Sequence, residues 1–143
     1  MIACDVNVLV HAFNADDPHH EPYREWLEGA ASGPEPLGLP SAVASGFVRV
    51  VTHPKVLAEP LDVARALDLV GMLRSAPSVV TLDPGPRHWS LFDDLCRRTG
   101  ARGNAVPDAF LAALAIEHGC VWVTADRGFA RYPGLRLRHP LDS

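Results

Sequence analysis

Residues 107–126 read PDAFLAALAIEHGCVWVTAD, and this stretch decides the predicted fold class. Pro107 suits the first position of a helix, because the N–H at that position has no partner within the helix. Residues 109–118 supply an apolar helix body, and Gly119 suits the cap at its end. Residues 120–124 follow as a buried strand. A helix that leads directly into a buried strand is typical of an α/β protein.

Helices and strands alternate along the rest of the chain as well. Apolar or β-rich runs predict strands at residues 1–4, 78–82 and 135–137. Helical spacing of apolar side chains predicts helices at residues 8–13, 23–30, 41–51, 62–74 and 88–99, with Ser41 as a cap and Gly100 as a terminator. Residues 33–40 are rich in Pro and Gly and predict a loop. The alternation predicts an α/β fold around a mostly parallel sheet.

The length and composition fit one folded domain. The chain has 143 residues, a size that predicts a single domain over 1–143. Hydrophobic residues make up 48% and charged residues 21%, which excludes a disordered chain. The net charge of −4 excludes a protein that binds nucleic acid through overall positive charge alone. Residues 73–143, however, carry nine Arg against seven carboxylates, and Arg suits phosphate groups.

The cysteines and the hydropathy pattern indicate a compartment. Cys4, Cys96 and Cys120 are scattered and odd in number, which favours a reducing environment. The longest apolar run, residues 109–116, is far shorter than the roughly 20 residues of a membrane span. The N-terminus has Asp5 where a signal peptide needs an apolar stretch. We therefore expect a cytoplasmic protein that does not enter a membrane.

Three aspartates stand where an active site is expected. Active sites of parallel sheets gather beyond the carboxyl ends of the strands. Asp5 follows the first strand, Asp126 follows the strand at 120–124, and Asp108 opens the helix that leads into that strand. Each also has a structural reading, since Asp5 can cap a helix, Asp126 can form a turn and Asp108 suits a helix dipole. Their joint placement favours a site.

Clustered carboxylates predict a particular chemistry. Without Cys or His at metal spacing, they suit a hard cation such as Mg²⁺ or Mn²⁺. Such a cation activates water and stabilises charge on a phosphoryl group, so phosphodiester hydrolysis is the leading hypothesis. Asn7 and Thr124 can orient a water or a phosphate oxygen. Arg127 and Arg131 flank the Asp126 loop and are the predicted phosphate contacts.

The motifs resemble the PIN domain of VapC toxins, the ribonuclease halves of type II toxin-antitoxin pairs. The similarity lies in DVNVL at residues 5–9, PDAFLAALA at 107–115 and VTADRGF at 123–129 with PGL at 133–135, and it spans almost the whole chain. It implies a PIN-type three-layer α/β/α sandwich, Mg²⁺-dependent RNA cleavage and a VapB-type antitoxin. It also implies that Asp5 and Asp108 are the principal metal ligands and that Asp126 completes the acidic pocket.

One position departs from the family pattern and keeps alternatives open. VapC toxins commonly have a Glu in the helix after the first long loop, and this chain has Gly46 there. Asn104 offers a neutral substitute ligand or a turn residue. The loss of the Glu allows a catalytically degenerate PIN module that only binds RNA or protein. A small-molecule phosphatase with Asp5 as nucleophile is a further alternative, but that class needs a second Asp where the chain has Asn7.

Several other side chains have a structural and a functional reading. The apolar neighbours of Trp26, Trp89 and Trp122 favour packing over base stacking, and most histidines suit the surface, although His11 can face the crevice. The apolar stripes of residues 23–30, 41–51 and 62–74 exceed what one face of a small sheet requires. They predict a groove for an antitoxin helix that presents an Arg or Lys to the acidic pocket, a homodimer interface, or both.

Overall fold

The computed structural model describes residues 1–142, so the predicted domain end at residue 143 lies outside the described residues. Its centre is a sheet of five parallel strands in the order β3-β2-β1-β4-β5. The strands are β1 (Ile2–Cys4), β2 (Leu37–Pro40), β3 (Val79–Leu82), β4 (Val121–Val123) and β5 (Arg136–Arg138). The helices are α1 (Val6–Phe13), α2 (His20–Ser32), α3 (Ser41–Val51), α4 (Val63–Arg74), α5 (His88–Thr99), α6 (Ala105–Glu117) and the short 3-10 helix η1 (Arg127–Arg131).

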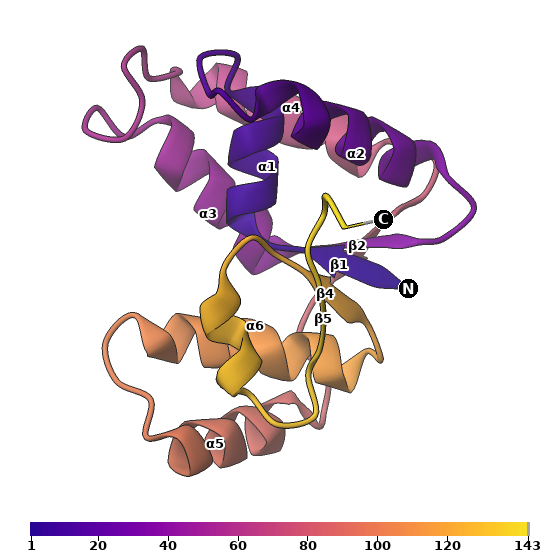
Figure 1. Ribbon diagram of the computed structural model, residues 1–143, viewed down its shortest axis with the longest axis vertical. Helices are drawn as coiled ribbons and strands as arrows, with labels where there is room; N and C mark the ends of the chain where they lie inside the picture. Colours follow the sequence, from indigo (N-terminus) through magenta and orange to yellow (C-terminus); the bar gives the residue numbers. More distant parts are fainter. Residues whose placement is uncertain (143) are drawn as a thin grey trace.

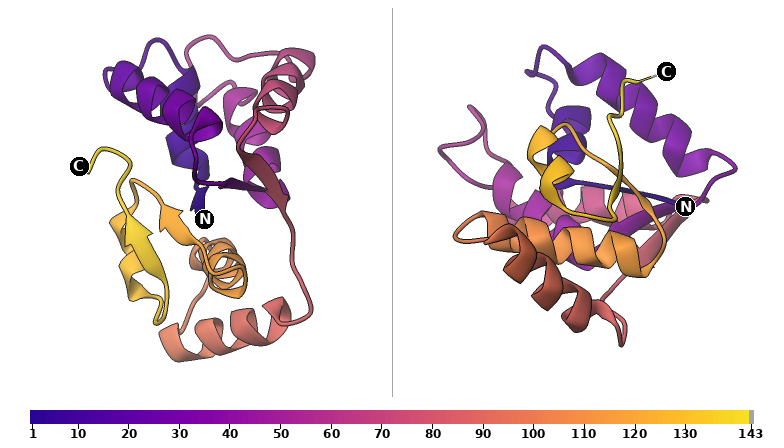
Figure 2. Two further views of the ribbon diagram at one scale, coloured as in Figure 1. Left: turned by 90° about the vertical axis from the view of Figure 1, so that its right-hand side faces the viewer. Right: turned by 60° about the horizontal axis from the view of Figure 1, so that its bottom comes forward.

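The helices cover both faces of this sheet. In Figure 1, α1 to α4 lie above the strands, and α5 and α6 lie below them. The two turned views in Figure 2 show the same three layers. The predicted α/β/α sandwich is confirmed, and the sheet is parallel at every pairing between described strands.

Local sequence signals explain where the helices begin and end. The Asp5 carboxylate accepts a hydrogen bond from the Val6 N–H, and the Asp62 carboxylate accepts one from the Arg65 N–H. Each aspartate thereby satisfies a free N–H at a helix start. After α5 the chain turns at Gly100, whose φ of +64° is a left-handed conformation that favours glycine.

Three predicted boundaries were wrong. The stretch predicted as a loop at residues 33–40 contains β2, whose residues are all buried. A Cβ at Gly38 would lie 2.4 Å from Leu82 Cδ1, so a glycine here marks close packing and not a turn. Helix α6 begins at Ala105, two residues before Pro107. Ser41 is the first residue of α3, and the cap position belongs to Pro40.

The core is continuous across the sheet. Ala3, Cys4 and Val123 are fully enclosed, and α6 is buried along most of its circumference because the sheet covers one side of it and α5 the other. Burial and the neighbouring Asp5 charge raise the pKa of the Cys4 thiol to about 12. Among residues 1–142, no helix has both the length and the apolar content that crossing a membrane requires.

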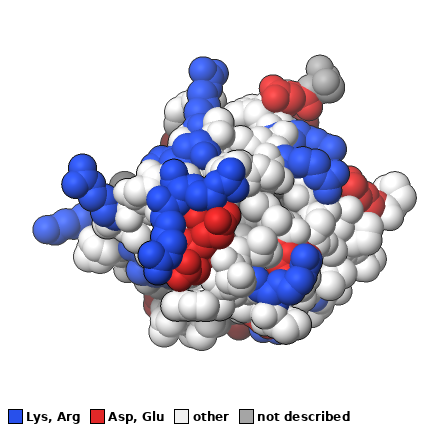
Figure 3. Space-filling model, turned by 90° about the horizontal axis from the view of Figure 1, so that it is seen from below, with Lys and Arg blue, Asp and Glu red and all other residues white. Residues whose placement is uncertain are grey.

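The surfaces of α4 and α5 differ in character. Helix α4 exposes the apolar side chains of Val63, Leu67 and Met72. Helix α5 instead pairs Arg97 with Asp93 and Arg98 with Asp94. Viewed from below, on the side where α5 lies, basic and acidic side chains adjoin (Figure 3). The surplus apolar surface predicted for the first half of the chain therefore lies on α4.

Candidate active site

Two neighbouring strands end at the same edge of the sheet. Strands β1 and β4 pair in parallel with Cys4 opposite Val123, so the next residues, Asp5 and Thr124, lie side by side. The Thr124 hydroxyl donates a hydrogen bond to Oδ2 of Asp5 at 2.8 Å, and the Asp5 N–H donates to the Val123 carbonyl at 3.0 Å. The sheet therefore fixes both the backbone and the carboxylate of Asp5.

The Asp5 carboxylate is buried but well supplied with donors. The residue is only 7% exposed. Its Oδ1 accepts from the Val6 N–H at 2.7 Å, and its Oδ2 accepts from the Asn7 side-chain amide at 3.3 Å in addition to Thr124. These bonds hold the carboxylate in one orientation at the start of α1.

Thr124 links this carboxylate to the Asp126 loop. Its hydroxyl oxygen accepts hydrogen bonds from the Asn7 amide at 3.2 Å and from the Asp126 N–H at 3.0 Å. Asn7 Oδ1 in turn accepts from the Ala125 N–H at 3.2 Å, and the Asp126 carboxylate accepts from the Gly128 N–H at 2.8 Å. Asn7 and Thr124, predicted to orient a water or a phosphate, therefore contact the aspartates and hold the two loops together.

The third aspartate joins from the opposite layer. Asp108 lies in the first turn of α6 and is half-buried. Asp5, Asp108 and Asp126 all line one cavity of about 1020 Å³, whose walls also come from α1, α3 and α5. The structure thus brings together the three aspartates that the sequence singled out.

The charges of these carboxylates oppose one another. Burial raises the pKa of Asp5, and the negative charge of Asp126 raises it further, against the lowering effect of the hydrogen bonds from Thr124, Val6 and Asn7. Burial likewise raises the pKa of Asp108, followed by the charges of Asp5 and Asp126. Repulsion of this kind is relieved when a cation binds.

The residues present fit a hard divalent cation. Within residues 1–142, no group of three or more His, Cys, Asp and Glu side chains is placed so that it could hold a metal ion by itself. Mg²⁺, however, is commonly held by one or two carboxylates and several waters. The oxygen donors of Asp5 and Asp108 suit this mode, and the mutual repulsion in the cavity favours it.

The two arginines predicted to contact RNA lie on either side of the Asp126 loop. Arg131 donates from Nε to the Gly128 carbonyl at 2.7 Å, and its guanidinium lies 5.6 Å from the centre of the Tyr132 ring. Its positive charge partly offsets the rise in the pKa of Asp108. Arg127 lines a separate groove of about 340 Å³ that also includes Asp126. The charge of Arg131 therefore acts on Asp108, and Arg127 lies in the groove beside the acidic cavity.

The departure from the family pattern lies on α3, in the wall of the same cavity. Gly46 lines the cavity, and a Cβ there would lie 2.9 Å from Val6 Cγ2. Arg49, one turn further along α3, also lines the cavity and is exposed. The sequence reasoning missed Arg49, although its spacing from Gly46 puts both residues on one face of the helix.

Other candidate residues are also placed. Asn104 lines the cavity but caps α6 without a side-chain hydrogen bond. Trp122 is fully buried and Trp26 packs against the core, as predicted. The packing prediction for Trp89 was wrong, since this side chain is 69% exposed. On the surface helix α5, Phe92 packs inward while Trp89 faces outward.

Comparison with known proteins gives the class. A family profile described as the PIN domain matches residues 2–135. The matched region covers most of the chain and includes the aspartates that follow β1 and β4. The three-layer fold agrees with this match. The chain belongs to the PIN-domain family.

Curated relatives narrow this class. Ribonuclease VapC43 of Mycobacterium tuberculosis is 49% identical over 142 residues, covering 99% of this chain and 97% of the relative. Ribonuclease VapC25 of the same organism is 36% identical over 142 residues, covering 99% of this chain and 100% of the relative. Within the PIN-domain family, the chain therefore groups with the VapC ribonucleases.

Solved structures share the fold. VapBC2 from Rickettsia felis, bound to a DNA fragment from its promoter, aligns with a TM-score of 0.72 at 20% identity, covering 97% of this chain and 98% of that chain. VapC20 from Mycobacterium tuberculosis, a toxin that cleaves the sarcin-ricin loop, aligns with a TM-score of 0.67 at 16% identity, covering 95% and 99%. These similarities support the fold assignment.

Proposed function

We propose that the protein is the toxin of a type II toxin-antitoxin pair and acts as a metal-dependent endoribonuclease that hydrolyses RNA phosphodiester bonds. The observation that carries this function is the cavity that Asp5, Asp108 and Asp126 line together, in which burial and neighbouring negative charge raise the pKa values of Asp5 and Asp108. The kinship with VapC ribonucleases supports the same activity.

Asp5 and Asp108 hold the cation, and Asp126 completes the acidic pocket. The cation is Mg²⁺, with Mn²⁺ as a substitute, and when bound it supplies an activated water and stabilises charge on the phosphate. Thr124 and Asn7 keep Asp5 oriented through the hydrogen bonds described above.

Positive charge lies in the cavity wall and next to it. Arg49 on α3 lines the cavity, Arg127 lines the adjacent groove and the charge of Arg131 acts on Asp108, and all three offer donors to the RNA backbone. Guanidinium groups suit this task because they bind phosphate oxygens in pairs. Together they offset the repulsion between RNA and the carboxylates.

The proposed protein partner is a VapB-type antitoxin. The cavity that holds the aspartates also has apolar walls, including Val10, Phe92 and Phe110. An amphipathic helix of the antitoxin fits such walls and can present an Arg or Lys to the carboxylates. The exposed apolar side chains of α4 favour a homodimer that leaves this cavity free. We place both assemblies in the cytoplasm.

The alternatives have less support. The phosphatase reading requires an Asp at position 7, and Asn7 is already occupied with Asp5, Thr124 and Ala125. The binding-only module draws on Gly46, but the other carboxylates still share one cavity. We therefore favour the nuclease.

The test is end-mapping of total RNA incubated with the purified protein. We expect defined new ends in the presence of Mg²⁺ or Mn²⁺, and none with a chelator. Co-expression with the product of the adjacent small reading frame should yield a stable complex in which cleavage is suppressed. Intact RNA with either metal would contradict the nuclease, and equal cleavage with and without the neighbouring protein would contradict the toxin.

A further inference from the structure

His11 lies on the cavity wall one turn beyond Asn7. Residues four apart share one face of a helix, and both Asn7 and His11 line the cavity. Four residues of α-helix rise about 6 Å along the axis. His11 is therefore close to the acidic pocket but displaced from its carboxylates by about one helical turn.

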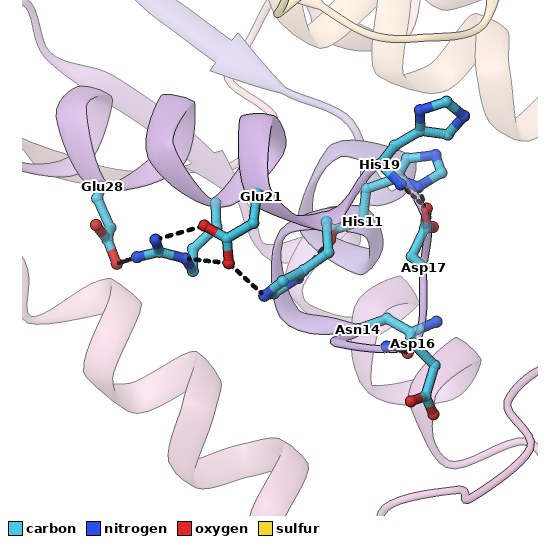
Figure 4. Close-up of polar contacts among 9 residues, drawn as sticks. His11, Asn14, Asp16, Asp17, His19, Glu21 and Glu28 are labelled. Carbon is cyan, nitrogen blue, oxygen red and sulfur yellow. Dashed lines mark hydrogen bonds and ion pairs between the residues drawn. The ribbon is translucent and has the colours of Figure 1, made fainter.

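A carboxylate from the following loop fixes the imidazole. Asp17 Oδ2 pairs with His11 Nδ1, and Asp17 Oδ1 accepts from the His19 N–H at 2.7 Å (Figure 4). Partial burial raises the pKa of Asp17, but the hydrogen bonds from His19 and His11 lower it overall. Asp17 is thus ionised at neutral pH and can accept a hydrogen bond from Nδ1 of His11.

Neighbouring rings restrict how the imidazole turns. The Tyr23 ring lies 4.5 Å from the His11 ring, and the His19 ring lies edge-on at 6.2 Å. The His20 ring nitrogen contacts the His11 carbonyl at 3.1 Å. With Nδ1 held by Asp17 and the Tyr23 ring packed against it, the imidazole has a defined orientation.

The other ring nitrogen is free to bind a ligand. The His11 side chain is 29% exposed. Among the contacts of residues 1–142, Nε2 of His11 has no hydrogen-bond partner, and it does not belong to the enclosed polar atoms that lack one. A polar atom that is oriented, accessible and without a partner in a substrate cavity is suited to contact substrate.

The charges around the cavity identify the group that would be bound. Asp5, Asp108 and Asp126 repel a phosphate, whereas His11 and Arg49 are the basic side chains in the described lining of this cavity. A hydrogen bond from Nδ1 to Asp17 and one from Nε2 to a phosphate oxygen together use one proton on each ring nitrogen.

We propose that His11, held by Asp17, donates a hydrogen bond from Nε2 to an RNA phosphate next to the one that is cleaved. This inference rests on the proposed ribonuclease function and adds a positioning contact on the α1 wall. His11 acts on where the RNA lies, while the cation and the aspartates act on the bond that breaks.

The experiment compares RNA binding with and without the imidazole. Binding of a labelled, mixed-sequence single-stranded RNA is measured with Mg²⁺ in an Asp5→Asn background, where cleavage is removed. We expect His11→Gln to weaken binding roughly tenfold. It should also lower the slope of log affinity against log salt by about 0.7, the value for one phosphate contact on a single strand. His11→Lys, which retains a cationic donor, should restore the slope.

A pH series separates His11 from its titrating neighbours. Histidine side chains in general gain charge between pH 8 and pH 5, so the informative quantity is the difference between each chain and its own His11→Gln derivative. We expect binding to weaken from pH 5.5 to pH 8 in a way that His11→Gln removes. His53→Gln is the matched control, because His53 does not line the cavity.

A second variant keeps the test decisive if His11→Gln does not fold. Asp17→Asn removes the carboxylate that holds Nδ1 of His11, so RNA binding should weaken and the salt slope should fall as in His11→Gln. The matched control is Asp16→Asn, which makes the same charge change at an exposed neighbouring residue.

The outcomes separate this inference from the proposed function. Failure of the unsubstituted protein to cut RNA would contradict the ribonuclease itself. Cleavage by that protein, together with a salt slope and pH profile unchanged in folded His11→Gln and Asp17→Asn variants, would overturn the role of His11 alone. Loss of all RNA binding in the Asp5→Asn background would also count against this phosphate contact.

Discussion

Two aspartates near the ends of α1 have pKa values that are shifted in opposite directions. At its start, Asp5 accepts three hydrogen bonds and still has a raised pKa, because it is buried and faces Asp126. Just beyond its end, Asp17 has a lowered pKa, because His11 and the His19 N–H supply donors. Hydrogen bonds alone therefore do not set the state of a buried carboxylate. The pKa of Asp17 is lowered by donors within the chain, whereas burial and the charge of Asp126 outweigh the donors at Asp5.

The largest expected effect is on the rate of RNA cleavage and concerns the Asp5 end of α1. Asp5→Asn or Asp108→Asn removes a ligand charge and should lower the rate of RNA cleavage by about a hundredfold or more, since even residues behind metal ligands cost 10- to 100-fold. The measurement is the rate at which new RNA ends appear with Mg²⁺, on protein whose thermal melt is normal. Asp68→Asn on α4, an exposed residue outside the cavity, is the control. A folded Asp5→Asn chain that cuts RNA at the normal rate would contradict the proposed role of Asp5 as a metal ligand.

A smaller effect is expected on RNA binding when the positive charges of η1 are removed. Exchanging Arg127 and Arg131 together for Gln should weaken binding of single-stranded RNA about tenfold and lower the salt slope by about 1.4, the value for two phosphate contacts. The loss should be similar for different RNA sequences, because phosphates carry no sequence information. Affinity measured over a salt series checks this.

The control for that pair is the double exchange of Arg65 and Arg74 for Gln on α4, which changes the net charge equally. A salt slope that falls as much in the control as in the η1 variant would show that overall charge, and not the position of the arginines, holds the RNA.

The smallest effect is on stability, where the two ends should respond with opposite sign. A raised folded pKa means that Asp5 contributes least to stability above that pKa, so stability falls as pH rises from the unfolded value of about 3.9. A lowered folded pKa means that Asp17 stabilises above about pH 3.9, and this contribution is lost as pH falls. Without metal at pH 7, Asp5→Asn should raise the free energy of unfolding by about 1 kcal/mol and Asp17→Asn should lower it by about 1 kcal/mol.

Thermal or urea unfolding between pH 3 and pH 8 measures both signs. Adding Mg²⁺ should stabilise the unsubstituted chain, by about 2.7 kcal/mol at 100 times the dissociation constant, and should stabilise Asp5→Asn much less. Equal responses of the two variants to pH would mean that the environments of the two carboxylates do not differ in solution.

Much of this arrangement could be predicted from the sequence, for a physical reason. The carboxyl ends of parallel strands meet at one edge, so Asp5 and Asp126 were placed together by periodicity and topology. Asp108 followed from its position in the first turn of the helix before β4. The fold class needed only the alternation of helices and strands.

The remaining features depended on packing that a linear pattern does not reveal. Gly38 and Pro40 are typical of loops, yet both lie in β2. A glycine stands at position 38 because the strand lies too close to Leu82 for a Cβ. Trp89 has apolar neighbours in sequence, but they turn inward on α5 while it faces out. The role of Asp17 depends on a contact between a loop and α1 that no spacing rule encodes, whereas the helical spacing of Arg49 from Gly46 could have indicated its place in the cavity.

Because of the position of Cys4, its alkylation can report local opening of the protein. The thiolate is the form that reacts with alkylating reagents, and a pKa of about 12 in a fully enclosed side chain leaves almost none of it available. Modification therefore requires the centre of the sheet to separate from its helices. Because Cys4 lies in β1 and immediately precedes Asp5, the rate of its alkylation measures how often β1 becomes exposed, and a ligand that binds in the cavity should lower that rate.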